Sequence, residues 1–231
     1  MIQSEHEVLI ELIRRSPSLA TRLFAELGFD TPKYTSIRVE TTDIAADHHH
    51  LVILLLDGDT IVLAVVVEVR LHEHEEFRDW VPCAADVWAR HRRPTVLLVF
   101  APRPTAQRLR PPLLVGHPGL TLSPLVVGPE TIPVITDLQT ARELPELTLL
   151  SGTAHGEHHH DVLQAIAHAL KALEWPMRAA YVEHLARRLS GPSISKLDAF
   201  MTTVGSGRSI VAATGDEVKE EPESHQGVDR P

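Results

Sequence analysis

Residues 51–71 read LVILLLDGDTIVLAVVVEVRL and predict the centre of the fold. Two apolar runs, Leu51–Leu56 and Ile61–Val67, flank the segment DGDT at 57–60. Asp and Gly in such a segment favour a hairpin turn, because Gly accepts a positive φ and Asp tolerates one. Both runs are continuous and the second is rich in Val, which is typical of central strands covered on both faces. We therefore expect an antiparallel hairpin at the centre of a sheet.

The second run ends in two ionisable residues, Glu68 and Arg70. Because they are two residues apart, they lie on the same face of a strand. A charge at the end of a buried strand costs several kcal/mol unless it is paired, hydrated or bound to a metal. Two interpretations are open: a salt-bridged Glu68 where the strand emerges into solvent, or a functional carboxylate.

Length and composition indicate a globular protein of 231 residues, with either one large domain or a domain and an appendage. Hydrophobic residues make up 43% of the chain and aromatic residues 4%, so the core must be mostly aliphatic. The single cysteine, Cys83, excludes an intramolecular disulfide framework and is interpreted as a core residue. The polar opening MIQSE is no signal peptide, and the apolar runs are too short to span a bilayer. We therefore expect a cytoplasmic protein.

The net charge of −9 is spread unevenly, since residues 215–231 contain six acidic residues against two basic ones. An acidic surface gives no general attraction to nucleic acid, so DNA binding would need a local basic patch. Seven residues form the main basic concentration, and they fit either contacts to a phosphate backbone or a solvated helix end. They are Arg90, His91, Arg92, Arg93, Arg103, Arg108 and Arg110.

Apolar periodicity and capping residues predict two helices and a strand before the hairpin. The first helix begins with the capping box Ser4–Glu7 and runs to Arg15, and the second spans Ser18–Leu27. Ile37–Thr42 alternates as a strand does, and residues 43–50 are predicted to be a polar connection.

After the hairpin, residues 73–92 predict a helix with Trp80 and Trp88 on its apolar face, which starts near Val81 or is kinked at Pro82. A buried strand follows at 94–100. The Pro-rich region beyond it predicts short elements: a helix at 105–110, strands at 113–115, 121–127 and 133–135, and helices at 140–143 and 146–151.

The C-terminal part is predicted to be helical after a linker at Gly152–Glu157. Residues 161–189 form an amphipathic stretch broken at Trp175-Pro176, and 195–204 form a third helix. We expect domains at 1–156 and 157–204, with a disordered acidic tail at 205–231. One apolar stripe fits either a homodimer face or packing onto the sheet domain; it comprises Leu163, Ile166, Ala167, Leu170 and Leu173.

The chain resembles the PD-(D/E)XK nuclease superfamily, in particular its recombination-promoting, transposase-like nucleases and their actinobacterial relatives. The resemblance covers about residues 4–155. It rests on the order helix, strand, hairpin, helix, strand, and on four segments: AVVVEVRL at 64–71, the helix with Trp80 and Pro82, TVLLVF at 95–100, and GHPGLTLSPLVVGPETIPVITD at 116–137. The implied fold is α/β: a restriction-endonuclease-like mixed central sheet flanked by helices.

The resemblance implies hydrolysis of DNA phosphodiesters with Mg²⁺, or with Mn²⁺ in its place. Mg²⁺ prefers oxygen ligands and keeps several waters, one of which becomes the attacking hydroxide. Carried over to this chain, Glu68 matches the metal-binding glutamate and Val69 offers its backbone carbonyl. Glu7 takes the place of a first-helix glutamate that supports the metal, and Arg70 takes the place of the catalytic Lys or Gln.

Two positions depart from the pattern of the superfamily. The metal-binding aspartate expected at the start of the second strand falls on His50, and the nearest acidic residue is Asp47. His50 suits a transition metal better than Mg²⁺. Arg70 is always charged, so it cannot take a proton from water. Two functions therefore stay open: metal-dependent DNA hydrolysis, or a catalytically inactive nuclease fold that binds DNA or protein.

The arrangement of the site follows from counting outward from the hairpin turn. Pairing Leu56 with Ile61 places His50 opposite Val67 and next to Glu68. Asp47 should then lie within reach of Glu68, and Glu7 should approach from the first helix. Except for His50, we interpret the histidine clusters as surface loops, although metal binding by a histidine-rich protein is a third, weaker alternative. The clusters are His48–His50, His72/His74, His155 and His158–His160.

Overall fold

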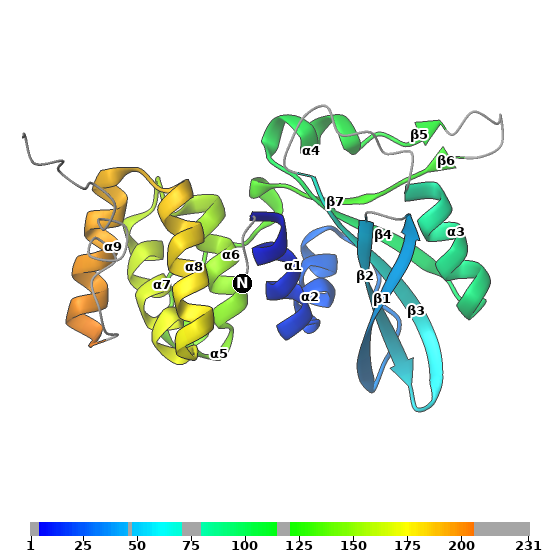
Figure 1. Cartoon of the computed structure of the whole chain (residues 1–231), viewed down its shortest axis with the longest axis horizontal. Coiled ribbons are helices and arrows are strands. Elements are labelled where there is room, and N and C mark those ends of the chain that lie inside the picture. Colours follow the sequence, from blue (N-terminus) through cyan, green and yellow to red (C-terminus); the bar gives the residue numbers. More distant parts are fainter. Residues whose placement is uncertain (1–4, 46–47, 71–79, 115–120, 206–231) are drawn as a thin grey trace, which may run out of the picture.

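A computed structural model describes residues 5–45, 48–70, 80–114 and 121–205, and every structural statement below concerns these residues. A sheet lies at one end of the molecule and helices α5–α9 lie at the other (Figure 1). Helices α1 (Glu5–Arg15) and α2 (Ser18–Glu26) lie between them. The N-terminal helices therefore connect the two parts through a shared core.

The sheet is mixed and has five strands in the order β1-β2-β3-β4-β7. The first three strands are antiparallel, β4 runs parallel to β3, and β7 runs parallel to β4. Residues 63–69 of the central β3 are buried, as the apolar run predicts. The strands are β1 Ser36–Ala45, β2 His48–Asp57, β3 Thr60–Val69, β4 Thr95–Phe100 and β7 Leu125–Val127. The predicted α/β class with a mixed central sheet is thus confirmed.

The two faces of the sheet carry separate apolar clusters, because alternate residues of a strand point to opposite sides. On one face, Leu51, Ile53, Val65 and Val67 share a core with α1 and α2. On the other face, a second cluster meets α3 (Trp80–His91) and α4 (Arg103–Leu109); its strand residues include Val52, Leu54, Ala64, Val66, Leu97 and Val99. Residue parity therefore decides which helices a side chain of β2 or β3 faces.

The pairing of β2 with β3 contains one register shift, which the turn sequence does not predict. Leu56 pairs with Ile61 as predicted, but Leu55 pairs with Leu63, so β3 carries one extra residue at Val62. From there the ladder runs to the pair Leu51–Val67, and one further step brings His50 level with Glu68. The prediction that His50 lies opposite Val67 is wrong by one residue, because a bulge inserts a residue into one strand only.

The segment 43–50, predicted to be a polar connection, belongs largely to the sheet. Strand β1 extends to Ala45 and β2 starts at His48, with Asp43 paired to His49 and a register shift before Ala45. Backbone hydrogen bonds hold such a ladder, so polar side chains on an edge pair do not end it. The corrected connection is residues 46–47, which lie outside the described residues.

The described part of the helix after the hairpin is α3, Trp80–His91, which contains Pro82. The rest of the predicted helix, residues 73–79, lies outside the described residues. Beyond β4, the predicted strand 121–127 is two strands, β6 (Thr121–Leu122) and β7; β6 pairs with β5 (Leu113–Leu114). The predicted strand 133–135 is wrong. Ile135 instead donates its backbone N–H to the buried Ser151 Oγ at 3.0 Å, because α6 lies where a neighbouring strand would be needed.

Five helices follow, and they show that the predicted linker 152–157 is wrong. Helix α6 continues through Gly152, which is buried and lies against Ile166 of α7. The predicted break at Trp175-Pro176 is confirmed, and Pro176 lies in the first turn of α8. The helices are α5 Leu138–Glu143, α6 Pro145–His155, α7 His160–Ala172, α8 Trp175–Arg188 and α9 Gly191–Val204.

The apolar stripe of α7 is buried within the chain itself, from Leu163 to Leu173. Its residues share one core cluster with α1 and with the odd-numbered residues of β3. The stripe is therefore covered inside the chain, where α7 packs chiefly against α5, α6 and α9, and the expectation of a homodimer stays a prediction. Within the described residues, no helix has the length and apolarity needed to cross a membrane. The predicted disordered tail lies, from residue 206 on, outside the described residues.

Candidate functional site

Three charged or titratable residues meet at the carboxyl end of β3, on the face that α3 covers. His50 comes from β2, Glu68 from β3, and Arg70 follows β3 directly. Their exposed fractions are only 3%, 6% and 8%. Burying such groups is costly unless they compensate one another. We call these three residues the His50–Glu68–Arg70 cluster.

Both carboxylate oxygens of Glu68 face nitrogen atoms within this cluster. His50 Nδ1 contacts Glu68 Oε1, and Arg70 Nη2 lies 3.5 Å from Glu68 Oε2. The Arg70 contact is an ion pair, and the His50 contact becomes one when the imidazole is protonated. Glu68 is therefore salt-bridged, as one interpretation of the sequence expected, but inside the protein rather than at an emerging strand end.

Arg70 is held in place by groups from two other elements. Its guanidinium lies over the ring of Trp80, 5.2 Å from the centroid, and Trp80 is the buried first residue of α3. Its backbone N–H donates to the carbonyl of Phe100 at 2.7 Å, which continues the parallel pairing with β4. A cation over an indole face is stabilised by the ring quadrupole, more strongly when water is excluded. Trp80 thus supports the cluster. Its predicted position on the apolar face of a helix does not indicate this role.

The described residues of the cluster do not fit Mg²⁺ or Mn²⁺. Such ions require several oxygen ligands and retain bound waters. Glu68 is the single carboxylate of the cluster, and its two oxygens already contact His50 and Arg70. No group of three or more His, Cys, Asp or Glu that could hold a metal is found in the described part of the chain. Asp47 lies outside the described residues.

The other two expected site residues are Glu7, on α1, and Val69, which follows Glu68 in β3. Helix α1 carries Glu7, whose side chain is exposed, and packs on the sheet face opposite to Glu68. That Glu7 approaches Glu68 stays a prediction. The Val69 side chain is buried on that same α1 face. Alternation along β3 points the side chains of Val69 and Glu68 to opposite sides. The expected role of Val69 concerns its backbone carbonyl and stays a prediction.

The fold divides the basic residues into two groups at opposite ends of β4. Arg90, Arg92 and Arg93 lie at the end of α3, just before β4 begins. Arg103 and Arg108 are exposed on α4, beyond the carboxyl end of β4 and hence at the same sheet edge as Glu68. The single basic concentration of the sequence is therefore two separate surfaces.

The group before β4 includes Trp88, whose exposure differs from what the helical periodicity predicts. Trp88 was expected on the apolar face of its helix, but it is 50% exposed. The guanidinium of Arg92 lies over its ring at 5.2 Å from the centroid. The apolar contacts of α3 to the sheet come instead from Trp80, Cys83 and Val87, which are buried. Cys83 is therefore a core residue, as expected.

The histidines near the junction of α6 and α7 hold no metal-like arrangement among the described residues. His155 Nε2 lies 2.8 Å from the carbonyl oxygen of Ile132, and its ring packs edge-on against His159. His158, His159 and His160 are exposed. His72 and His74, and the side chains of His48 and His49, lie outside the described residues.

Comparison with known proteins found no match to any family model, curated protein or solved structure.

Proposed function

We propose that this chain is a nuclease-like α/β protein that binds DNA without hydrolysing it. One observation carries the proposal: His50 and Arg70 engage both carboxylate oxygens of Glu68 in a buried cluster. In the superfamily that the chain resembles, the matching glutamate holds the metal. The order α1, α2, β1, β2, β3, α3, β4 supports the resemblance, because apart from the additional helix α2 it is the element order on which the resemblance rests.

The chemistry of the cluster argues against phosphodiester hydrolysis. That reaction needs a metal-bound water as nucleophile and a group that takes its proton. Arg70 cannot take a proton, and the charge of Glu68 is compensated by neighbouring nitrogen atoms. The cluster is also almost closed to solvent. Its residues are therefore suited to holding the end of β3 in place.

The surface proposed to contact DNA is α4, where Arg103 and Arg108 are exposed. Ligands of open α/β sheets bind beyond the carboxyl ends of the strands, and α4 follows β4 at that edge. Arginine suits phosphate oxygens because its planar guanidinium donates several hydrogen bonds. Since the whole chain carries a net charge of −9, binding should be weak and strongly salt-dependent.

Two measurements test the proposal together. Plasmid incubated with Mg²⁺ or Mn²⁺ should stay uncut by the wild type and by Glu68→Ala alike. Fluorescence anisotropy of a labelled DNA duplex should show binding that Arg103→Gln and Arg108→Gln each weaken, with the slope of log K against log salt reduced by about 1 per arginine. Arg187→Gln, which alters an exposed arginine of α8 paired with Glu183, is the control.

The two measurements distinguish DNA cleavage, DNA binding through α4 and protein binding. Cleavage that Glu68→Ala abolishes would overturn the inactive assignment. Equal binding by the wild type, the α4 variants and the control would remove α4 as the DNA surface. The absence of any DNA binding would favour the protein-binding alternative.

Metal-dependent hydrolysis is the second candidate, and one observation favours it. His50 Nε2 is buried and makes no hydrogen bond to any described residue. A free imidazole nitrogen is a good ligand for a transition metal. If such a metal binds, Mn²⁺ should raise the melting temperature of the wild type but not of His50→Ala.

A further inference from the structure

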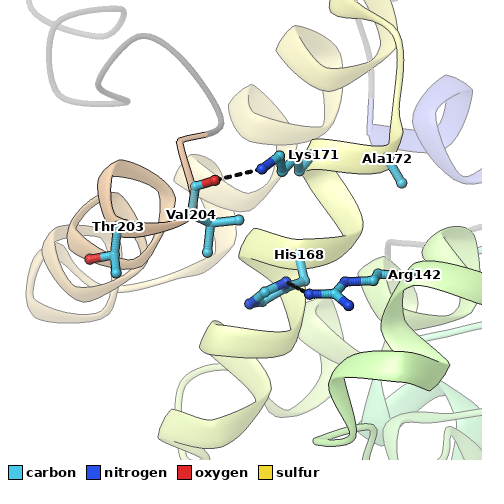
Figure 2. A pocket seen from close by; sticks show the side chains of 6 residues that line it. All are labelled: Arg142, His168, Lys171, Ala172, Thr203 and Val204. Atoms are coloured by element: carbon cyan, nitrogen blue, oxygen red, sulfur yellow. Dashed lines mark hydrogen bonds between the residues drawn. The ribbon is translucent and has the colours of Figure 1, made fainter.

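An open cavity of about 590 Å³ lies among α5, α7 and α9, away from the sheet. Figure 2 shows that Arg142 reaches it from α5, His168 and Lys171 from α7, and Thr203 and Val204 from α9. Ala172 completes the lining, so no described lining residue is acidic. We call this cavity the α5–α7–α9 pocket.

The hydrogen bonds within this pocket determine which hydrogen-bond donors remain available to a ligand. Arg142 Nη2 lies 3.1 Å from His168 Nδ1. A guanidinium only donates, so Nδ1 is the acceptor and the neutral ring carries its proton on Nε2. Lys171 Nζ donates to the carbonyl of Val204 at 2.8 Å, and its two other protons are not used by that bond. Arg142, His168 and Lys171 therefore present hydrogen-bond donors.

We propose that the α5–α7–α9 pocket binds an anionic oxygen group, either a phosphate or a carboxylate. Two permanent cations and an imidazole N–H converge there, with no acidic side chain among the lining residues to neutralise them. Charge-assisted hydrogen bonds to an oxyanion are stronger than those between neutral groups. An anion would also offset the mutual repulsion of Arg142 and Lys171.

Two sources can supply this chemistry. One is a free ligand that carries a phosphate. The other is the acidic segment 216–223 of the chain itself, which follows α9 in the sequence. Val204, the last residue of α9, forms part of the pocket wall. The eleven intervening residues 205–215 can span more than ~30 Å when extended, so this segment has the length to reach the pocket.

Anion binding should depend on pH through His168. Burial of the ring, followed by the charges of Arg142 and Lys171, lowers the pKa of His168 from its ordinary value of 6.5. Arg142 faces the ring from α5 and Lys171 from its own helix, whereas Thr203 and Val204 of α9 carry no charge. A bound anion favours the protonated ring, so it should raise this pKa and bind more tightly as the pH falls.

The test uses the full chain and inorganic phosphate as the probe. We expect NMR titration to show that phosphate raises the pKa of His168. We also expect Arg142→Gln and Lys171→Gln each to weaken phosphate binding about tenfold. Lys196→Gln is a matched control, because Lys196 of α9 likewise contacts a histidine of α7, His160 at 2.9 Å, outside the pocket. The control should change binding less than about twofold.

A tail variant identifies the source of the anion. If the tail occupies the pocket, neutralising it should lower the His168 pKa without added phosphate and tighten phosphate binding, because the competitor is gone. If the ligand is free, both quantities should stay unchanged. The substitutions are Asp216→Asn, Glu217→Gln, Glu220→Gln, Glu221→Gln and Glu223→Gln. The proposal is overturned if neither phosphate nor the tail changes the His168 pKa, or if phosphate binds equally well to the wild type, Arg142→Gln and Lys171→Gln.

Discussion

His50 Nδ1 contacts Glu68 Oε1 across the β2–β3 ladder, at a point where both side chains are almost fully buried. The contact exists because the extra residue at Val62 shifts the register and brings His50 level with Glu68. On the other side of the carboxylate lies Arg70, which rests on Trp80. A buried carboxylate is thus matched by nitrogen atoms on both of its oxygens.

Glu68→Ala should destabilise the protein strongly, because it leaves the buried Arg70 without its carboxylate. Removing one partner of a buried ion pair costs about 3–5 kcal/mol in free energy of unfolding. Urea denaturation measures this loss. Glu183→Ala is the control, since Glu183 pairs with Arg187 on the surface, where such a pair contributes at most about 1 kcal/mol. Equal losses in the two variants would show that the cluster does not hold the fold.

Gly152→Ala should also destabilise the protein, although alanine normally favours a helix. A Cβ at Gly152 would overlap Cδ1 and Cγ1 of the buried Ile166, so either that side chain would have to shift within the core or α6 and α7 would have to separate. Overpacking of this kind costs about 1–3 kcal/mol in free energy of unfolding. Thermal and urea unfolding of the variant measure the change.

Two further variants check the cause of that loss. Ile166→Ala removes the obstructing atoms, so the double variant should be more stable than the sum of the single losses predicts. Gly191→Ala should be close to neutral, because no atom lies within 4 Å of the added Cβ. A loss in Gly152→Ala that Ile166→Ala does not relieve would contradict the packing argument.

Asp137 should stabilise α5 in a pH-dependent way. Its carboxylate accepts hydrogen bonds from Thr140 N at 2.7 Å and Thr140 Oγ1 at 2.8 Å, which lower its pKa below the ordinary value of 3.8. The stabilisation is therefore present above pH 3.8 and is lost as the pH falls through the pKa of the folded state. Asp137→Ala should melt at a lower temperature than the wild type at neutral pH, and the difference should shrink in acid. Asp137→Asn keeps a hydrogen-bond acceptor, so its melting temperature should fall less than that of Asp137→Ala.

His168 should make the protein less stable in mild acid. Because its pKa in the folded state lies below 6.5, the unfolded chain binds the proton more readily. Stability is thus highest above pH 6.5 and falls as the pH drops towards the pKa of the folded state, below which the loss is complete. In His168→Gln this part of the pH dependence should disappear from urea midpoints measured between pH 7 and pH 5. The variant His158→Gln, which alters an exposed histidine, should keep it.

Local patterns in the amino-acid sequence were enough to predict several elements. The run 51–71 predicted the hairpin and its burial, because apolar strands on both sides of a Gly-containing turn have few other stable arrangements. The Trp175-Pro176 break separated two helices correctly, since Pro176 can only occupy a first turn. Glu68 and Arg70 were assigned to one face from the two-residue period of a strand alone.

The way these elements meet emerged from the three-dimensional structure alone. The bulge at Val62 shifted the pairing partner of His50 by one residue. No local sequence pattern predicts such an inserted residue. The sheet placed the apolar side of α1 on the face opposite to the Glu68 side chain. Gly152 resembled a linker residue because glycine is common in loops, yet its missing side chain lets α6 approach α7. Local sequence constrains backbone conformation over a few residues, whereas register, face and close packing depend on partners that are distant along the chain.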